Sequence, residues 1–195
     1  MATVLDAIDE KLAGWLEAQP VVFVATAPSR GGHLNLSPKG GTGTFRVLDP
    51  LRVAYVDLYG SGAETAAHLH DDGRIVVMAC AFEGRPRIVR LHGTGRLHVP
   101  DEPAHDALLA GFDLRDEQRQ AARGIVDVAV TRVADSCGYT VPEMTPVAER
   151  TQLYRAAEHR IAKDGPDAIA RSVADRNDVS IDGLPAYPTP ELPPR

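Results

Sequence analysis

Two long apolar runs joined by three residues decide the fold class of this chain: RIVVMACAF at residues 74–82, EGR at residues 83–85 and PRIVRLHGTGRLHV at residues 86–99. The first run is nearly continuous in apolar residues, as in a buried strand, and the second alternates. The EGR connection is so short that the two strands must lie antiparallel. This hairpin predicts an antiparallel sheet or barrel.

Shorter strand-like runs flank the hairpin on both sides. They cover residues 21–27, 33–37, 51–57 and 125–133. Residues 4–16 instead carry apolar side chains at helical spacing, which predicts an amphipathic helix that ends near Pro20. The sequence therefore predicts an α+β fold, mainly antiparallel β, with an N-terminal helix.

The second half of the chain has helical patterns that predict a cover over the β core. They fall at residues 101–112, 114–124, 147–163 and 166–176. The segment 180–195 is rich in proline, which predicts an extended tail that is draped over the protein or disordered. A length of 195 residues suits one sizeable core, so we expect one domain.

Composition excludes several classes of function. The formal net charge of −6 argues against a nucleic-acid partner. No apolar run approaches the roughly 20 residues that cross a bilayer, and the first residues lack the order of a secretion signal, so we expect a cytoplasmic protein without a membrane partner. Cys80 and Cys137 are too few for a disulfide framework, and the scattered histidines predict no metal site.

The segment GSGAETAAHL, residues 60–69, lies between two predicted strands and reads as a tight turn that opens into a helix. Gly60 and Gly62 permit the turn and leave the backbone N–H groups accessible. Ser61 and Thr65 add hydroxyl groups, and the start of a helix favours an anion such as phosphate. The alternative interpretation is an ordinary capped helix after a loop.

Two other segments carry polar side chains that suit an anionic ligand. In NLSPKGG, residues 35–41, Ser37 offers a hydroxyl and Lys39 a point charge, unless the lysine is simply solvated. In the second hairpin strand, alternation places Arg87 and Arg90 on opposite faces. An arginine that points inward needs an anion, either a ligand or an internal carboxylate such as Asp57 or Glu64.

Cys137, within SCGY at residues 136–139, invites interpretation as a nucleophile. No histidine or basic residue lies near it in the sequence to lower its pKa, so a packed or unreactive thiol is the preferred interpretation. The sequence assigns no catalytic residue.

Taken in order, these segments resemble the pyridoxamine 5′-phosphate oxidase-like flavoproteins. The matching segments are FVAT 23–26, NLSPKG 35–40, VAYVD 53–57, GSGAET 60–65, DGRI 72–75, PRIVRLHG 86–93, SCGY 136–139 and SIDGLP 180–185, the last preceded by Asn177. The resemblance implies a split β-barrel, a homodimer, and flavin mononucleotide (FMN) in each of two clefts between the subunits. It implies a flavin-binding domain over residues 1–145, with residues 146–195 as a helical extension and proline-rich tail of the same domain.

The resemblance also implies which residues contact the cofactor. The expected contacts are Ser37 and Lys39, then Val56 and Asp57 on a second strand, Ser61, Gly62, Glu64 and Thr65 around the phosphate, and Arg87 and Arg90 near the ring edge. The oxidases carry an Arg-Lys pair where Glu64 and Thr65 stand here, so Arg87 or Arg90 is expected to supply the missing positive charge.

The resemblance departs from the true oxidases at residues 190–195. The oxidases end in Arg-x-Leu-x-Pro, which helps to bind pyridoxal phosphate, whereas this chain reads PELPPR. The sequence therefore predicts an FMN-dependent oxidoreductase that acts on a different, unidentified small molecule. The alternatives are a deazaflavin-dependent reductase and a non-catalytic, dimeric flavin-binding module.

Overall fold

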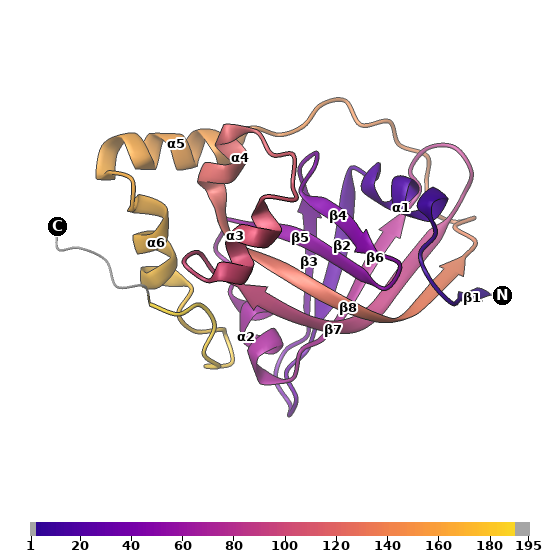
Figure 1. Ribbon diagram of the computed structural model, residues 1–195, viewed down its shortest axis with the longest axis horizontal. Coiled ribbons are helices and arrows are strands. Elements are labelled where there is room, and N and C mark those ends of the chain that lie inside the picture. Colours follow the sequence, from indigo (N-terminus) through magenta and orange to yellow (C-terminus); the bar gives the residue numbers. More distant parts are fainter. Residues whose placement is uncertain (1–2, 190–195) are drawn as a thin grey trace.

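A computed structural model describes residues 3–189, which form an antiparallel half-barrel flanked by helices (Figure 1). Seven strands follow the order β3-β2-β6-β7-β8-β5-β4, and β1 pairs with β8. The strands are β1 Thr3–Leu5, β2 Val21–Thr26, β3 Asn35–Gly40, β4 Phe45–Asp49, β5 Arg52–Leu58, β6 Arg74–Cys80, β7 Ile88–His98 and β8 Ala122–Ser136. This architecture confirms the predicted α+β split barrel.

The hairpin that decides the fold forms between β6 and β7, whose register runs from Arg74 opposite Thr94 to Cys80 opposite Ile88. Gly84 in the connection has a φ of 73°, a value that glycine adopts without strain. β7 then pairs along its length with β8, and a register shift at His92/Gly93 bends the pair. A Cβ atom on Gly93 would lie 2.1 Å from the carbonyl oxygen of Ala129, so this bend requires glycine.

The N-terminal helix is α1, Glu10–Glu17, capped by the Asp9 carboxylate, which accepts a hydrogen bond from the Leu12 N–H at 2.7 Å. It buries Leu12 and Leu16 against the sheet. The prediction of a helix from residue 4 was wrong at its start. Thr3–Leu5 is instead strand β1, because its extended backbone pairs with residues 133–135 of β8.

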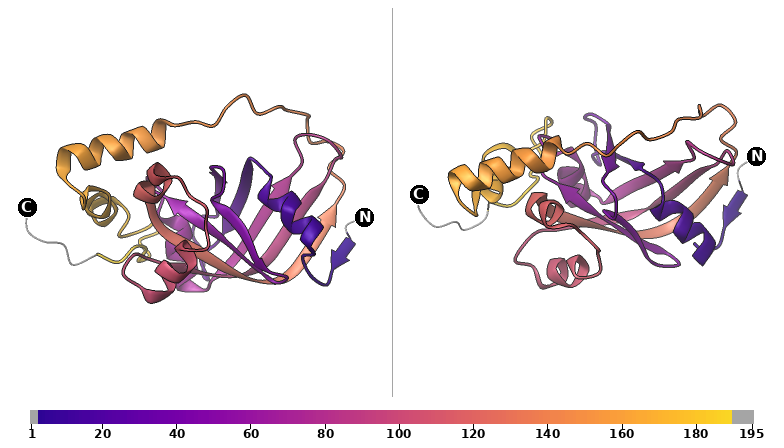
Figure 2. Two further views of the ribbon diagram at one scale, coloured as in Figure 1. Left: turned by 45° about the horizontal axis from the view of Figure 1, so that its top comes forward. Right: turned by 90° about the horizontal axis from the view of Figure 1, so that it is seen from above.

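The remaining helices gather mostly at the opposite end of the sheet from α1 (Figure 2). They are α2 Glu64–Asp71, α3 Pro103–Leu109, α4 Asp116–Ala121, α5 Gln152–Asp164 and α6 Ala168–Arg176. The predicted helix over 114–124 ends early because Ala122 already pairs with Leu58 as the start of β8. The part of the tail up to Thr189 is extended and packed, with Ala186 and Tyr187 buried, while residues 190–195 lie outside the described part.

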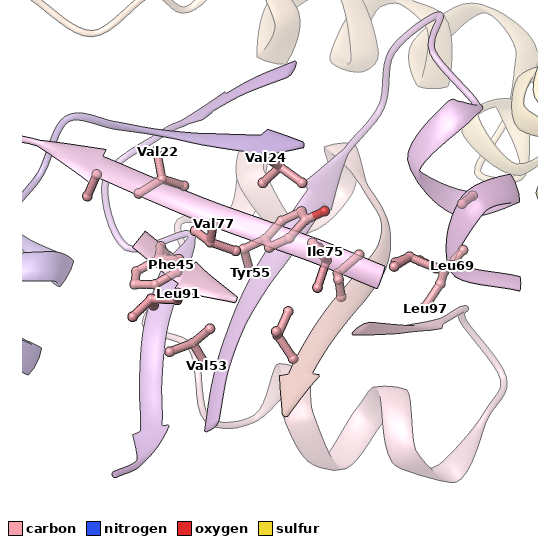
Figure 3. Packing of buried hydrophobic residues seen from close by; sticks show 14 of the residues in the cluster. Val22, Val24, Phe45, Val53, Tyr55, Leu69, Ile75, Val77, Leu91 and Leu97 are labelled. Atoms are coloured by element: carbon pink, nitrogen blue, oxygen red, sulfur yellow. The ribbon is translucent and has the colours of Figure 1, made fainter. Parts of the chain in front are cut away.

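The core fills the concave side of the half-barrel, and Tyr55 lies among its aliphatic side chains (Figure 3). The same cluster includes Tyr154 of α5 and Ile169 of α6, so these helices share the core of the sheet. β3 and β4 end the strand order, which leaves the half-barrel open between them. The polar side chains described next come from β3, β5, β8 and the tail near this opening.

Candidate functional site

The Asp57 carboxylate, at the end of β5, forms the centre of a buried polar cluster. It accepts hydrogen bonds from Lys39 Nζ at 2.8 Å, from Arg123 Nε at 3.0 Å and from the Tyr187 hydroxyl. These partners come from β3, β8 and the tail. Only 2% of Asp57 is exposed, so its charge depends on these partners rather than on water.

The cluster keeps Asp57 ionised and Tyr187 neutral. Burial by itself raises the pKa of the Asp57 carboxyl, but the positive charges of Lys39 and Arg123 outweigh it and lower that pKa below its ordinary value. Burial, reinforced by the Asp57 charge, raises the pKa of Tyr187 well above its ordinary value. Two cations therefore face one carboxylate and a neutral phenol, and the cluster retains one net positive charge.

Arg123 connects this cluster to the turn over residues 60–65. Its Nη1 donates to the Gly60 carbonyl at 3.1 Å, and its Nη2 donates to the Gly62 carbonyl at 2.8 Å. Asn177, which is fully buried after α6, donates to the Ser61 carbonyl between them at 3.0 Å. Three successive carbonyl groups of the turn are thus held by side chains of the protein.

Most backbone N–H groups of this turn make no hydrogen bond within the described part of the chain. Within residues 3–189, no hydrogen bond is made by the backbone N–H of Ser61, Gly62 or Thr65. The N–H of Ala63 donates to the carboxylate of Glu64 at 3.1 Å, so this side chain folds back over the start of its own helix. The turn therefore combines satisfied acceptors with free donors, as an anion site requires.

A polar network orients the Thr65 hydroxyl at the start of α2. Asn35 Nδ2 donates to Thr65 Oγ1 at 2.8 Å and lies 3.4 Å from Thr26 Oγ1, which in turn contacts His68 Nδ1 at 3.0 Å. Because the Thr65 oxygen accepts from Asn35, its own proton is available to a ligand.

Ser37 lies between Asn35 and Lys39 on the same face of β3. Its Oγ is buried and has no hydrogen-bond partner within the described residues, and the same holds for the Tyr55 hydroxyl on β5. Buried polar atoms without partners are rare and costly, so these two atoms point to a missing polar partner beside β3 and β5.

Val56 and the two predicted arginines stand apart from this cluster. The Val56 side chain packs on the other face of β5 with Ala54 and Ile125. Arg87 binds Asp135 through Nε at 3.1 Å and Nη2 at 2.6 Å, near the end of β7–β8 that is remote from the turn. The internal carboxylate for Arg87 is therefore Asp135, and not Asp57 or Glu64 as the sequence suggested.

Arg90 is half-buried on β7, opposite Met78 and Ala134. Within one chain, the structure thus brings together Lys39, Asp57 and the turn, and it leaves Arg87 and Arg90 elsewhere. Cys80, which lies near Arg90, is buried, and burial raises the pKa of its thiol. Cys137 is exposed.

Sequence reasoning missed Arg123 and Tyr187 and gave Asn177 no role. Arg123 lay inside a predicted helix, where an arginine is usually solvated. The sequence did contain one signal for such a partner. Asp57 ends an apolar strand, and a carboxylate buried there needs a cation beside it. Tyr187, the aromatic residue of the proline-rich tail, was a second signal, because large aromatic rings are usually packed.

The described residues hold no group of three histidine, cysteine, aspartate or glutamate side chains arranged for a metal ion. Nor does any helix among them have the length and apolar character needed to cross a membrane.

The chain belongs to the pyridoxamine 5′-phosphate oxidase family, whose sequence model matches residues 8–137. A curated relative, the pyridoxamine 5′-phosphate oxidase family protein ustO of Aspergillus flavus, is 36% identical across 92% of this chain and 76% of its own length. Among solved structures, a variant of HupZ from Group A Streptococcus gives a TM-score of 0.51 at 20% identity, covering 66% of this chain and 99% of that chain. That likeness supports the fold.

Proposed function

We propose that the protein is an FMN-dependent oxidoreductase whose flavin phosphate binds at the turn over residues 60–65. One observation carries the proposal: Arg123 and Asn177 hold the carbonyl groups of Gly60, Ser61 and Gly62. Among the described residues, the N–H groups of Ser61, Gly62 and Thr65 have no hydrogen-bond partner. A phosphate needs such donors, and the Thr65 hydroxyl adds another. Membership of the family supports a flavin as the source of that phosphate.

Charge supports the same assignment. Arg123 joins the turn to the Asp57 cluster, which has one more positive than negative charge. The Glu64 carboxylate occupies the Ala63 N–H, so a bound phosphate displaces it from that donor. The positive cluster offsets the remaining repulsion from Glu64.

The unpartnered hydroxyl groups of Ser37 and Tyr55 suit the polar part of a flavin beyond its phosphate. The bound flavin supplies a ring that accepts and returns a hydride. The chain's own contribution is to orient that ring from β3 and β5 and to exclude water with the C-terminal tail.

We also propose that the protein is a homodimer with a cofactor cleft at each side of the interface. Leu36 of the edge strand β3 is 68% exposed, on the face opposite Lys39, and Leu34, just before the strand, is 84% exposed. Burying them against a second copy removes apolar surface from water. The free thiols of Cys80 and Cys137 suit a reducing compartment such as the cytoplasm.

Titration of the purified protein with FMN, followed by flavin fluorescence, tests the proposal. Thr65→Val and Ser37→Ala should each weaken FMN binding about tenfold, the effect of one hydrogen bond to a charged or buried group. Thr145→Val, in an exposed loop, is the matched control. Protein that neither retains nor binds flavin would refute the cofactor assignment.

The same titration with a deazaflavin separates the alternative reductase, which predicts tighter binding of that cofactor. Reduction of the bound flavin by nicotinamide cofactors or candidate substrates then distinguishes an enzyme from a flavin-binding module without turnover.

A further inference from the structure

The polar network at the start of α2 reaches from the protein core to the proposed phosphate site. His68 is fully buried, and Thr26 and Thr65 are 4% and 8% exposed. Asn35 is half-buried on the edge strand β3, opposite Thr26 of β2. Thr65 and His68 are three residues apart in α2, so both lie on the same side of that helix. The network therefore joins β2, β3 and α2.

The four side chains contact one another in a fixed order. Asn35 Nδ2 lies 2.8 Å from Thr65 Oγ1 and 3.4 Å from Thr26 Oγ1. Thr26 Oγ1 in turn lies 3.0 Å from His68 Nδ1. Within residues 3–189, the two hydroxyl groups have no other hydrogen-bond partner, and His68 Nε2 is buried without one. The direction of each bond therefore follows from the protons and lone pairs of these four groups.

The contact between Thr26 and His68 sets the first direction. If His68 carried its proton on Nδ1, the buried Thr26 hydroxyl proton would have no acceptor, and His68 Nε2 would also remain unpaired. With the proton on Nε2, Thr26 donates to Nδ1, and only the Nε2 N–H lacks a partner among the described residues. The second arrangement leaves fewer buried groups unsatisfied, so His68 accepts the Thr26 proton.

The orientation of the Asn35 amide follows from that direction. Because the Thr26 proton is directed to His68, the Thr26 oxygen presents only lone pairs to Asn35. The amide then turns its NH₂ group, and not its oxygen, toward both threonines. The Thr65 oxygen accepts one of these amide protons, so the Thr65 hydroxyl proton is directed away from Asn35 and is available to a ligand.

We propose that His68, Thr26 and Asn35 are positioning residues that make the Thr65 hydroxyl a hydrogen-bond donor to the phosphate of FMN. The inference rests on the proposed function, since it concerns the same site. His68 is fully buried and acts through Thr26 and Asn35 without touching the ligand. Without His68, the Thr26 proton turns toward Asn35 and the amide rotates to accept it. The Thr65 proton then points to the amide oxygen instead of the phosphate.

Flavin fluorescence titrations with FMN and with riboflavin, which lacks the phosphate, test the proposal. His68→Phe keeps a ring and removes the acceptor, and Asn35→Leu removes the amide without adding charge. Each should lower the preference for FMN over riboflavin about fivefold, the effect of one misdirected hydrogen bond to a charged group. In a Thr65→Val background neither substitution should lower the preference further, because the hydroxyl that they orient is absent.

His105→Phe is the matched control. His105 of α3 is also a buried histidine whose Nε2 has no partner among the described residues, but it does not contact the network. Its substitution should leave the preference for FMN unchanged, even if it lowers stability. The preference therefore separates positioning of the hydroxyl from a general structural role.

The outcomes distinguish this inference from the proposed function. Equal binding of FMN and riboflavin by the wild type would overturn the phosphate site and this inference together. A wild-type preference for FMN that survives both substitutions would overturn this inference alone, as would losses that add to the loss caused by Thr65→Val. If His68→Phe fails to fold, Asn35→Leu and its combination with Thr65→Val still decide the matter.

Discussion

The Tyr187 hydroxyl donates a hydrogen bond to the Asp57 carboxylate, although 130 residues separate them in the sequence. Asp57 is near the end of β5, and Tyr187 lies in the extended tail after α6. The bond fixes the tail against the cluster of Lys39, Asp57 and Arg123. The position of the tail is therefore part of the stability of the half-barrel.

Tyr187→Phe should lower the free energy of unfolding by about 2 kcal/mol, because the substitution removes a buried hydrogen bond to a charged acceptor. Urea denaturation measures the change. Tyr139→Phe is the matched control, since Tyr139 is 81% exposed. Equal stability of the two variants would show that the tail contributes nothing through this bond.

Asp57→Asn should destabilise the protein by about 3–5 kcal/mol, because it leaves the buried Arg123 and the largely buried Lys39 without a counter-charge. The exposed Asp175→Asn on α6 provides the comparison and should change stability by less than about 0.5 kcal/mol. Thermal and urea unfolding of both variants test this expectation. A small loss for Asp57→Asn would mean that water or a counter-ion reaches the cations.

Stability should fall in acid partly through Asp57. Its pKa is lower in the folded state than the ordinary value of 3.8, so its contribution is fully present above that value. It is lost as the pH falls below 3.8 and through the lower folded pKa, because the unfolded chain then binds more protons. Unfolding free energies between neutral pH and about pH 3 should therefore decline more steeply for the wild type than for Asp57→Asn. Parallel curves would contradict this assignment.

Glu64→Gln should strengthen FMN binding about tenfold, because it removes a negative charge from the start of the helix that receives the phosphate. Riboflavin, which lacks the phosphate, should bind both proteins equally. Glu83→Gln, in the exposed β6–β7 connection, controls for net charge. An equal gain for riboflavin and FMN would place Glu64 beside the ring instead of the phosphate.

Local patterns predicted most of the sheet. The β6–β7 hairpin and the start of α2 followed from a few adjacent residues, because turn chemistry and alternation act over short distances. The sequence did not predict β4, because this strand is short and one of its faces turns inward only when it pairs with β5. Likewise, β1 became a strand only through β8.

The candidate site was only half predictable for a related reason. The family resemblance predicted the residues that lie in short motifs close together in the sequence, namely Ser37, Lys39, Asp57 and the turn. Arg123 reaches Asp57 across 66 residues, and Tyr187 reaches it from the tail, so no local pattern specified either contact. Arg87 shows the same limit, because its partner Asp135 becomes adjacent only when β7 and β8 pair.

The long separation of Asp57 and Tyr187 also orders events during synthesis. At typical ribosomal rates, the 130 residues between them take on the order of 10 s to make. Strands β6 to β8 are translated within that interval, whereas the phenol that closes over the carboxylate is made only at its end. Until Tyr187 is made, the Asp57 carboxylate therefore lacks this hydrogen bond, and the tail cannot yet cover the cluster.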